Sequence, residues 1–173
     1  HHRVMVVEVM GRYAGWIALH AGAAGGADVI CIPEIPYDMQ KIAEYTLARS
    51  KKGKRFSIIA IAEGAKPKGG SMVIYKKVKN SPDPLRLGGI SGVMADQLER
   101  LTGLSCRAVN LGHVQRGGSP TPFDRVLGTN FGFHALELLA AGHTNRLVVW
   151  TDGKLGDIPL GRTAGRTKTV KPG

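Results

Sequence analysis

Short apolar runs that alternate with helical patterns constrain the fold of this 173-residue chain more than any other feature. The runs are continuous, as in strands that are buried on both faces, and they cover residues 3–9, 28–32, 56–62, 107–111 and 147–150. Helical patterns lie between them, over residues 14–24, 38–50, 91–101 and 121–141. Because neighbouring parallel strands need such crossovers, the sequence predicts an α/β fold, a three-layer sandwich with a mainly parallel sheet.

Two of the helices begin with clear capping signals. Asp38 stands where the side chain of an N-cap residue accepts a hydrogen bond from the first turn. Thr121 is a second N-cap candidate, with Pro122 at the first helical position and Asp124 favourable to the helix dipole.

The length of the chain fits one domain with a real core. We expect residues 1–150 to form this domain and residues 151–173, which are glycine-rich and basic, to form a partly loose carboxyl-terminal extension. The sequence starts at His1 and enters the first strand almost at once, so we expect the chain to be part of a longer protein.

Polar segments that contain glycine follow three of the strands. Met10-Gly11-Arg12 follows the first strand, Glu63-Gly64 the third, and Gly112-His113-Val114-Gln115-Arg116-Gly117-Gly118 the fourth. In folds of this kind ligands bind at the edge of the sheet where the carboxyl ends of the strands meet. Glycine lets the backbone come close to a phosphate, and arginine offers a planar charged group to its oxygens. The sequence therefore predicts an anion-binding site at this edge.

Four side chains at this edge suit a phosphorylated polyol. Arg12 and Arg116 supply positive charge, His113 supplies a hydrogen-bond donor, and Glu63 accepts hydrogen bonds from sugar hydroxyls. Three of them have a plainer alternative: a surface salt bridge for Arg12, a packed loop position for His113, and a solvated carboxylate for Glu63. The alternative is weakest for Arg116, which lies between a glutamine and two glycines.

Arg3 and Arg107 lie near the amino ends of their strands, away from this edge. At roughly 3.3 Å per strand residue, Arg3 lies about 25–30 Å from Arg12, and Arg107 about 20 Å from His113. These distances are too long for one compact sugar-phosphate site. The two arginines are therefore either structural or contributed to the site of a second copy of the chain.

The net charge of +11 restricts the kind of partner. Such a charge is also typical of nucleic-acid-binding proteins, but the lysines of residues 51–55 and 66–79 lack interleaved aromatic residues. We interpret them as a solvated face and expect anionic small molecules rather than nucleic acid as ligands.

The apolar runs and the cysteines indicate the cellular context. No apolar run approaches the roughly 20 residues that cross a membrane, so we expect a cytoplasmic protein without membrane contact. Cys31 and Cys106 lack the spacing of a metal or redox pair. We therefore expect buried free thiols and no metal site built from this chain.

Three segments together resemble the carboxyl-terminal, substrate-binding half of bacterial-type 6-phosphofructokinase: VVEVMGRYAGWIALHAGAAGGADVICIPE, AIAEG and LGHVQRGGSPTPFDRVLG. The resemblance implies a phosphofructokinase-like fold and a fructose 6-phosphate pocket, with Arg12 also stabilising the transition state. It also implies that Arg3 and Arg107 reach a neighbouring subunit, in a homodimer or homotetramer. The pocket residues implied in this way are Met10, Gly11, Arg12, Glu63, His113, Val114, Gln115 and Arg116.

Some members of this family have an effector site. Its positions correspond to Gly26, Asp28, Lys52 and Lys54, although some regulated members have arginine at the position of Lys52. The lysines fit equally well as a solvated helix end, so the sequence leaves allosteric control open.

The resemblance implies that the intact enzyme transfers a phosphoryl group to the 1-hydroxyl of fructose 6-phosphate in glycolysis. The glycine-rich donor loop and the aspartate base of the family have no counterpart in this sequence, so we expect them, and Mg²⁺ bound with the donor, in an amino-terminal half. We expect the isolated chain to be inactive. ATP is favoured as donor over pyrophosphate, and a non-catalytic sugar-phosphate or polyanion-binding module is the alternative from another functional class.

Overall fold

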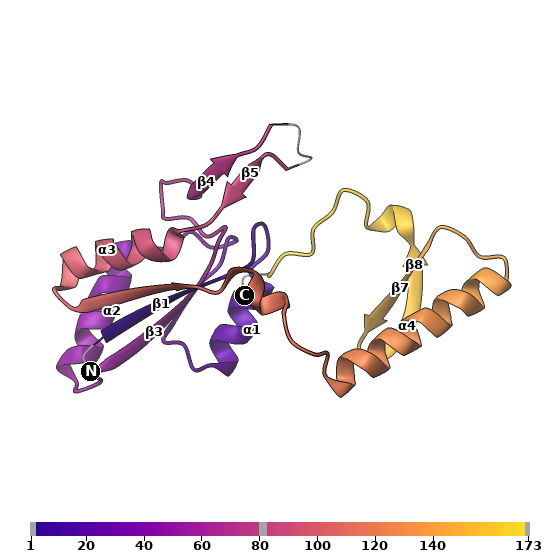
Figure 1. Ribbon diagram of the computed structural model, residues 1–173, viewed down its shortest axis with the longest axis horizontal. Helices are drawn as coiled ribbons and strands as arrows, with labels where there is room; N and C mark the ends of the chain where they lie inside the picture. The colour runs from indigo at the N-terminus through magenta and orange to yellow at the C-terminus, as the bar shows by residue number, and fades with distance from the viewer. Residues whose placement is uncertain (1–2, 80–82, 172–173) are drawn as a thin grey trace. The chain divides into compact units, whose positions relative to one another are not determined.

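A computed structural model describes residues 3–79 and 83–171 of the chain (Figure 1). It divides into two compact units. Unit 1 comprises residues 1–116 and 168–173, and unit 2 comprises residues 117–167. All residues predicted to bind ligands belong to unit 1.

Unit 1 is built on a four-stranded parallel sheet with the strand order β2-β3-β1-β6. Val9 of β1 lies beside Ala62 of β3, and Glu8 beside Asn110 of β6, so the carboxyl ends of these strands meet at one edge, which we call the rim. The mainly parallel sheet is confirmed, and so are its first four strands. Their bounds are β1 (Arg3–Val9), β2 (Val29–Cys31), β3 (Phe56–Ala62) and β6 (Ser105–Asn110).

Helices cover both faces of this sheet because successive strand residues point to opposite sides. Val4 and Val6 pack into a core cluster with Leu98 of α3 and with residues of α2. Val9 packs into a second cluster with Ala18 of α1. The α/β layers predicted from the sequence are therefore present. The helices are α1 (Trp16–Ala24), α2 (Met39–Lys51) and α3 (Ile90–Thr102).

The predicted helix starts are confirmed in atomic detail. The Asp38 side chain accepts a hydrogen bond from the Lys41 N–H at the start of α2. Thr121 and Asp124 form a reciprocal capping box at the start of α4 (Pro122–Ala140), with proline in its first turn. Both helices therefore begin where the sequence predicts.

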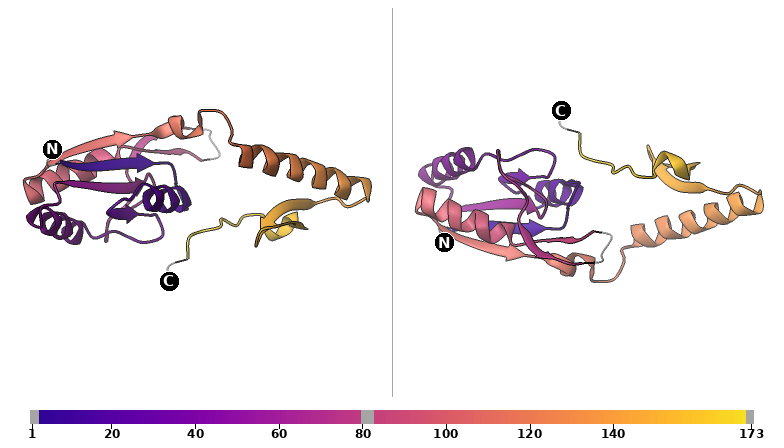
Figure 2. Two further views of the ribbon diagram at one scale, coloured as in Figure 1. Left: turned by 90° about the horizontal axis from the view of Figure 1, so that it is seen from below. Right: turned by 90° about the horizontal axis from the view of Figure 1, so that it is seen from above.

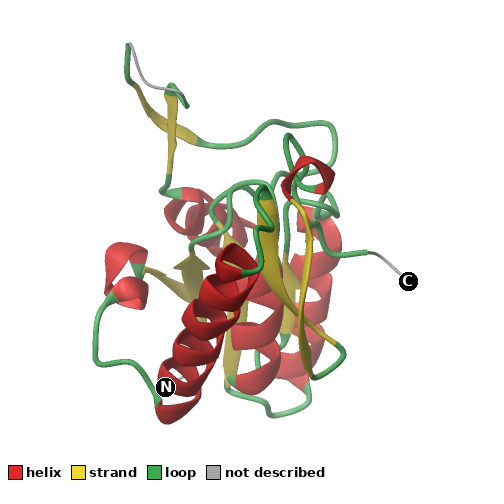
Figure 3. Cartoon of the chain, turned by 90° about the vertical axis from the view of Figure 1, so that its right-hand side faces the viewer, coloured by secondary structure: helices red, strands yellow, loops and turns green. Residues whose placement is uncertain are grey.

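A two-stranded antiparallel hairpin, β4 (Ile74–Lys77) and β5 (Leu85–Leu87), lies between β3 and α3. Figure 3 shows it projecting from the rest of unit 1. The sequence did not predict these strands, because their residues are largely exposed and lack an apolar alternation. The hairpin returns to the sheet at Gly88 and Gly89, directly before α3.

Unit 2 combines α4 with the antiparallel pair β7 (Arg146–Thr151) and β8 (Lys154–Pro159) (Figure 2). The prediction that residues 147–150 form a fifth strand of the parallel sheet is wrong, because this strand pairs with β8 instead. Asp152 and Gly153 between them have φ values of 52° and 75°, as a tight hairpin turn requires. The two units also differ from the expected ranges 1–150 and 151–173, because this hairpin spans residue 150.

The helix α4 has no buried residue in the described structure. Phe123, Phe133, Leu136 and Leu139 are each 63% exposed.

Within the described residues, no helix has the length and apolar character needed to span a membrane.

Candidate functional site

The structure brings three of the predicted loops together at the rim. The Glu63 N–H donates to the Val9 carbonyl at 2.9 Å, which joins the loop after β3 to the end of β1. The Met10 N–H donates to the Gln115 side-chain oxygen at 3.3 Å, which joins the loop after β1 to the loop after β6. Segments more than 100 residues apart in the chain are therefore linked directly, as in a binding site formed by several loops.

Two glycines allow the first two loops to touch. Gly11 has a φ of +145°, and a Cβ there would lie 2.9 Å from the Ala14 carbonyl oxygen. The Gly64 N–H donates to the Gly11 carbonyl at 3.0 Å, and a Cβ on Gly64 would overlap backbone atoms of Arg12. The close approach of the loops therefore depends on the absence of a side chain at Gly64.

The loop after β6 forms a 3₁₀ helix, Gly112–Arg116. His113, Val114 and Arg116 are exposed, and Val114 is 80% exposed. Gln115 is half-buried; its Nε2 donates to the Gly112 carbonyl while its Oε1 accepts the hydrogen bond from Met10. Gln115 therefore fixes the loop, whereas the side chains of His113 and Arg116 remain accessible to an anion.

Arg12 contacts the β4–β5 hairpin at the end where its two strands are joined. Its guanidinium forms an ion pair with Asp83 and donates to the Leu85 carbonyl at 2.7 Å. The Tyr13 hydroxyl donates to the same Asp83 carboxylate at 3.2 Å. The salt bridge considered as the plainer alternative for Arg12 is thus present, yet both partners remain partly exposed, with 20% and 35% of their side-chain surface accessible.

A hollow of about 360 Å³ lies beside Arg12 at the rim. Arg12 and Lys66 contribute positive charge to it, and Ser71 contributes a hydroxyl. The residues of the Gly112–Arg116 turn do not line it. The structure therefore joins the loops by hydrogen bonds without enclosing all predicted residues in one cavity.

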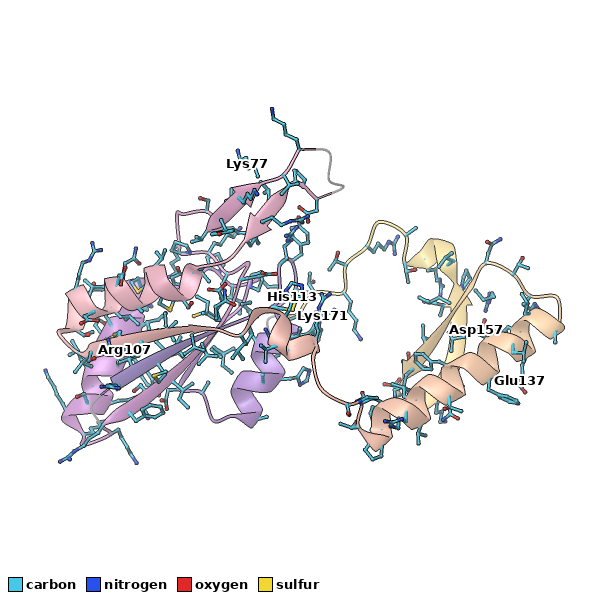
Figure 4. The ribbon with its side chains drawn as sticks, viewed as in Figure 1. Lys77, Arg107, His113, Glu137, Asp157 and Lys171 are labelled. Carbon is cyan, nitrogen blue, oxygen red and sulfur yellow. The ribbon has the colours of Figure 1, made fainter. Side chains whose placement is uncertain are left out.

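Arg3 and Arg107 lie at the opposite edge from His113. Arg107 is the third residue of β6 and His113 follows its end, and Figure 4 shows the two side chains at opposite ends of this strand. Arg3 is the first residue of β1 and pairs with Ser105 in β6. The strand geometry agrees with the separation expected from the sequence.

The predicted effector residues are mostly occupied by structural contacts. The Asp28 carboxylate accepts a hydrogen bond from the Ile58 N–H at 2.9 Å and pairs with Arg49 at 2.7 Å. Gly26 forms the turn before β2 with a φ of +67°, and Lys52 is the C-cap of α2. The hollow that Lys54 borders measures only about 10 Å³, which is about the space of one water molecule. The described contacts therefore favour the structural alternative for this set.

Glu8 is a rim residue that the sequence analysis did not identify. Its side chain is 2% exposed, although it lies in the apolar run of β1. A single acidic residue inside a continuous apolar strand is the sequence signal that marks it, because a buried carboxylate needs several donors around it.

The described residues contain no group of three histidine, cysteine or acidic side chains placed to hold a metal ion. Among the predicted pocket residues only Glu63 carries a carboxylate, and Mg²⁺ needs several oxygen ligands. The residues present therefore do not fit a Mg²⁺ site.

Both cysteines are free and buried, as predicted. Burial raises the pKa of Cys31 to about 12. Burial, together with the nearby charge of Glu99, raises the pKa of Cys106 to about 11. Both thiols therefore remain protonated at neutral pH, which excludes a thiolate nucleophile at either position.

Comparison with known proteins shows similarity over nearly the whole chain. The sequence profile of the family described as Phosphofructokinase matches residues 1–139. An ATP-dependent 6-phosphofructokinase 2 of Clostridium perfringens is 49% identical over 173 residues, which are 99% of this chain and 47% of that protein. A pyrophosphate–fructose 6-phosphate 1-phosphotransferase of Amycolatopsis methanolica is 45% identical over 172 residues, 99% of this chain and 50% of that protein. The chain therefore spans about half the length of the curated relatives it matches.

The solved structures agree with this similarity. The phosphofructokinase of Saccharomyces cerevisiae matches with a TM-score of 0.78 and 33% identity, over 94% of this chain and 20% of that chain. A pyrophosphate-dependent phosphofructokinase of Marinobacter aquaeolei matches with a TM-score of 0.74, over 97% of this chain and 42% of that chain. The latter is 23% identical and supports the fold alone.

Proposed function

This chain belongs to the phosphofructokinase family, and on that basis we propose that it is the sugar-phosphate-binding half of an enzyme that phosphorylates the 1-hydroxyl of fructose 6-phosphate. The observation that carries the proposal is the meeting of three loops at the rim, through the Met10–Gln115 and Gly64–Gly11 hydrogen bonds. The loops that carry Arg12, Glu63 and Arg116 thus end at one edge of a parallel sheet, where such folds bind ligands, and this supports the proposal.

In the proposed site two exposed hydrogen-bond donors, Arg116 and His113, hold the phosphate of the sugar. Arg116 and His113 flank the fixed Gln115, so both present their donors from a turn whose backbone is already ordered. Glu63 accepts hydrogen bonds from the sugar hydroxyls. Met10, Gly11 and Val114 shape the backbone of the pocket.

Arg12 has a second role in the proposed reaction. Phosphoryl transfer depends mainly on positioning and on stabilising negative charge as it spreads over the transferred group. Arg12 exchanges Asp83 for this developing charge and so stabilises the transition state. Mg²⁺ bound with the phosphoryl donor would neutralise part of the donor's charge, and residues outside this chain would hold it.

The donor is ATP in the proposed enzyme. Relatives named for ATP and for pyrophosphate are similarly close to this chain, at 49% and 45% identity. A kinase assay of the natural protein with each donor separates them. Turnover with pyrophosphate and none with ATP would show that pyrophosphate, not ATP, is the donor. Turnover by the isolated 173-residue chain would contradict the expectation that this chain alone is inactive.

Several further properties are part of the proposal. The enzyme acts in the cytoplasm as a homodimer or homotetramer, in which Arg3 and Arg107 serve the site of a neighbouring subunit. Regulation through Gly26, Asp28, Lys52 and Lys54 stays a prediction. The shared site is tested with the Arg3→Ala and Arg107→Ala variants. A loss of sugar-phosphate affinity that occurs only in the assembled protein supports it.

The proposed pocket is tested by calorimetric titration of fructose 6-phosphate into the protein and into its Arg116→Ala variant. We expect affinity to fall at least about tenfold, because a charged hydrogen bond contributes about 1.5–3 kcal/mol. Arg100→Ala removes one charge from the last turn of α3, outside the predicted pocket, and is the matched control. Equal losses in the two variants, with a steep dependence on salt, favour the alternative of a general polyanion-binding module.

A further inference from the structure

Glu8 is a buried carboxylate whose oxygens accept hydrogen bonds from neutral donors only, among the residues that the structure describes. Oε2 accepts hydrogen bonds from the Ser91 N–H at 3.0 Å and the Ser91 hydroxyl at 2.9 Å. Both oxygens lie 3.1 Å from the Gly89 N–H, and Oε1 also accepts from Asn110 Nδ2 at 3.0 Å. Within the described residues no lysine, arginine or histidine pairs with Glu8, so its charge faces the amino terminus of α3 and two polar side chains.

The donors to Glu8 come from two segments that lead into the proposed site. Asn110 ends β6 and stands two residues before the Gly112–Arg116 turn. The Glu8 main-chain carbonyl accepts from the Leu111 N–H at 3.1 Å, so the side chain and the backbone of Glu8 both hold the same end of β6. Glu8 itself stands two residues before Met10, which is hydrogen-bonded to Gln115 in that turn.

The second segment is the junction between the hairpin and α3. Gly88 and Gly89 have φ values of +143° and +85°, which glycine adopts readily. The hydrogen bond from the Gly89 N–H to the Glu8 carboxylate stabilises this conformation. The hairpin strand that ends at this junction supplies the Leu85 carbonyl, which accepts from Arg12. The position of the Arg12 partner therefore depends on the junction that Glu8 holds.

We propose that Glu8 is a positioning residue for the proposed sugar-phosphate site. It holds the ends of β1 and β6 and the base of the hairpin in one arrangement, and so sets the spacing between Arg12 and the Gly112–Arg116 turn. This role rests on the proposed function, and Glu8 itself touches no substrate.

The hydrogen-bond pattern explains why an amide is a poor replacement. Every group that faces Glu8 is a donor, and a carboxylate accepts at both oxygens. In a Glu8→Gln variant one oxygen still accepts from Ser91, while the new NH₂ group faces the Gly89 N–H, a backbone donor that cannot turn away, and bonds to Asn110 only if that amide turns by 180°. In a Glu8→Gln/Asn110→Asp double variant the amide at position 8 donates to the carboxylate at position 110. The hydrogen bond between β1 and β6 is then restored in the opposite direction.

The test compares four forms of the protein: wild type, Glu8→Gln, the double variant, and a Glu99→Gln control. Glu99 also joins α3 to β6 by accepting a backbone N–H, that of Cys106 at 3.3 Å, but it does so at the end of the sheet away from the rim. Titration with fructose 6-phosphate is expected to give an affinity about tenfold weaker for Glu8→Gln, unchanged for Glu99→Gln, and largely restored in the double variant.

Amide hydrogen exchange in the ligand-free protein supplies an independent measurement. We expect faster exchange in Glu8→Gln at the amides of Gly89, Met10 and Leu111, whereas Glu99→Gln changes only the region of Cys106. The positioning role is overturned if Glu8→Gln binds fructose 6-phosphate with unchanged affinity. It is also overturned if Glu8→Gln and Glu99→Gln lose the same amount of affinity. If the wild type does not bind fructose 6-phosphate, the proposed function fails, and exchange at Met10 and Leu111 still decides whether Glu8 holds the loops.

Discussion

Gly64→Ala is expected to separate the loops that meet at the rim. The added Cβ would lie within 2.9 Å of three backbone atoms of Arg12. No side-chain rotation relieves this overlap, because the atoms it meets are main-chain atoms. The loop after β3 must therefore move away from the loop after β1, and the 3.0 Å hydrogen bond from the Gly64 N–H to the Gly11 carbonyl is lost with it.

The expected loss of stability follows from this geometry. Overpacking a well-packed site costs about 1–3 kcal/mol, and we place Gly64→Ala at about 3 kcal/mol because backbone must shift. At about 2–4 °C per kcal/mol for a protein of this size, the melting temperature falls by about 6–12 °C. Thermal unfolding followed by circular dichroism measures this change.

Gly92→Ala is the matched control for this substitution. Gly92 lies inside α3 and a Cβ there meets no atom within 4 Å, so alanine is expected to stabilise the helix by about 0.5–1 kcal/mol. The two alanine substitutions therefore change stability in opposite directions. A Gly64→Ala protein that melts at the wild-type temperature or above refutes the reasoning that close backbone contact holds the rim together.

Three further predictions use other contacts of unit 1. Asp83→Asn removes the ion pair of Arg12 and is expected to tighten fructose 6-phosphate binding up to about fivefold in calorimetry, since partly exposed pairs contribute about 1 kcal/mol at most; weaker binding contradicts this. Cys31 and Cys106, with pKa values raised to about 12 and 11, are expected to react with a thiol reagent at pH 8 only after unfolding, and rapid labelling of the folded protein would disprove their burial. The hydrogen bond from the Lys41 N–H lowers the pKa of Asp38, so its contribution to stability is present above the ordinary value of 3.8 and is lost as the pH falls through the lower folded pKa. Acid unfolding of Asp38→Asn compared with wild type measures this loss, and identical profiles contradict it.

Local chemistry made much of the fold predictable from the sequence. The strand Phe56–Ala62 is a continuous apolar run, and its structure has the same bounds as the prediction. The Asp38 cap depends only on a hydrogen bond to a residue three positions away, so its residue type and place are sufficient to predict it. The same holds for the capping box of Thr121.

Features that depend on distant partners were not predictable in this way. Residues 147–150 have the composition of a buried parallel strand, but the Asp152–Gly153 turn pairs them with β8. Glu8 looked like an isolated charge in a strand because its donors, Gly89, Ser91 and Asn110, lie at least 81 residues away in the chain. The spacing of apolar residues along the sequence indicates which face of a helix or strand is buried. It does not indicate which distant segment supplies a hydrogen-bond donor.

The two interpretations of Arg12, as a phosphate-binding group and as a member of a salt bridge, are compatible. An arginine side chain that is only 20% exposed would be costly to keep near the hydrophobic end of β1 without an anion beside it, and Asp83 supplies that anion. A sugar phosphate or a transferring phosphoryl group carries the same sign of charge and offers more acceptor oxygens than one carboxylate. In the proposed site, binding would exchange one anion for another, so that Arg12 never becomes an unpaired charge. On this proposal the salt bridge keeps the arginine ordered at the rim until ligand binds, and its partial exposure allows the exchange.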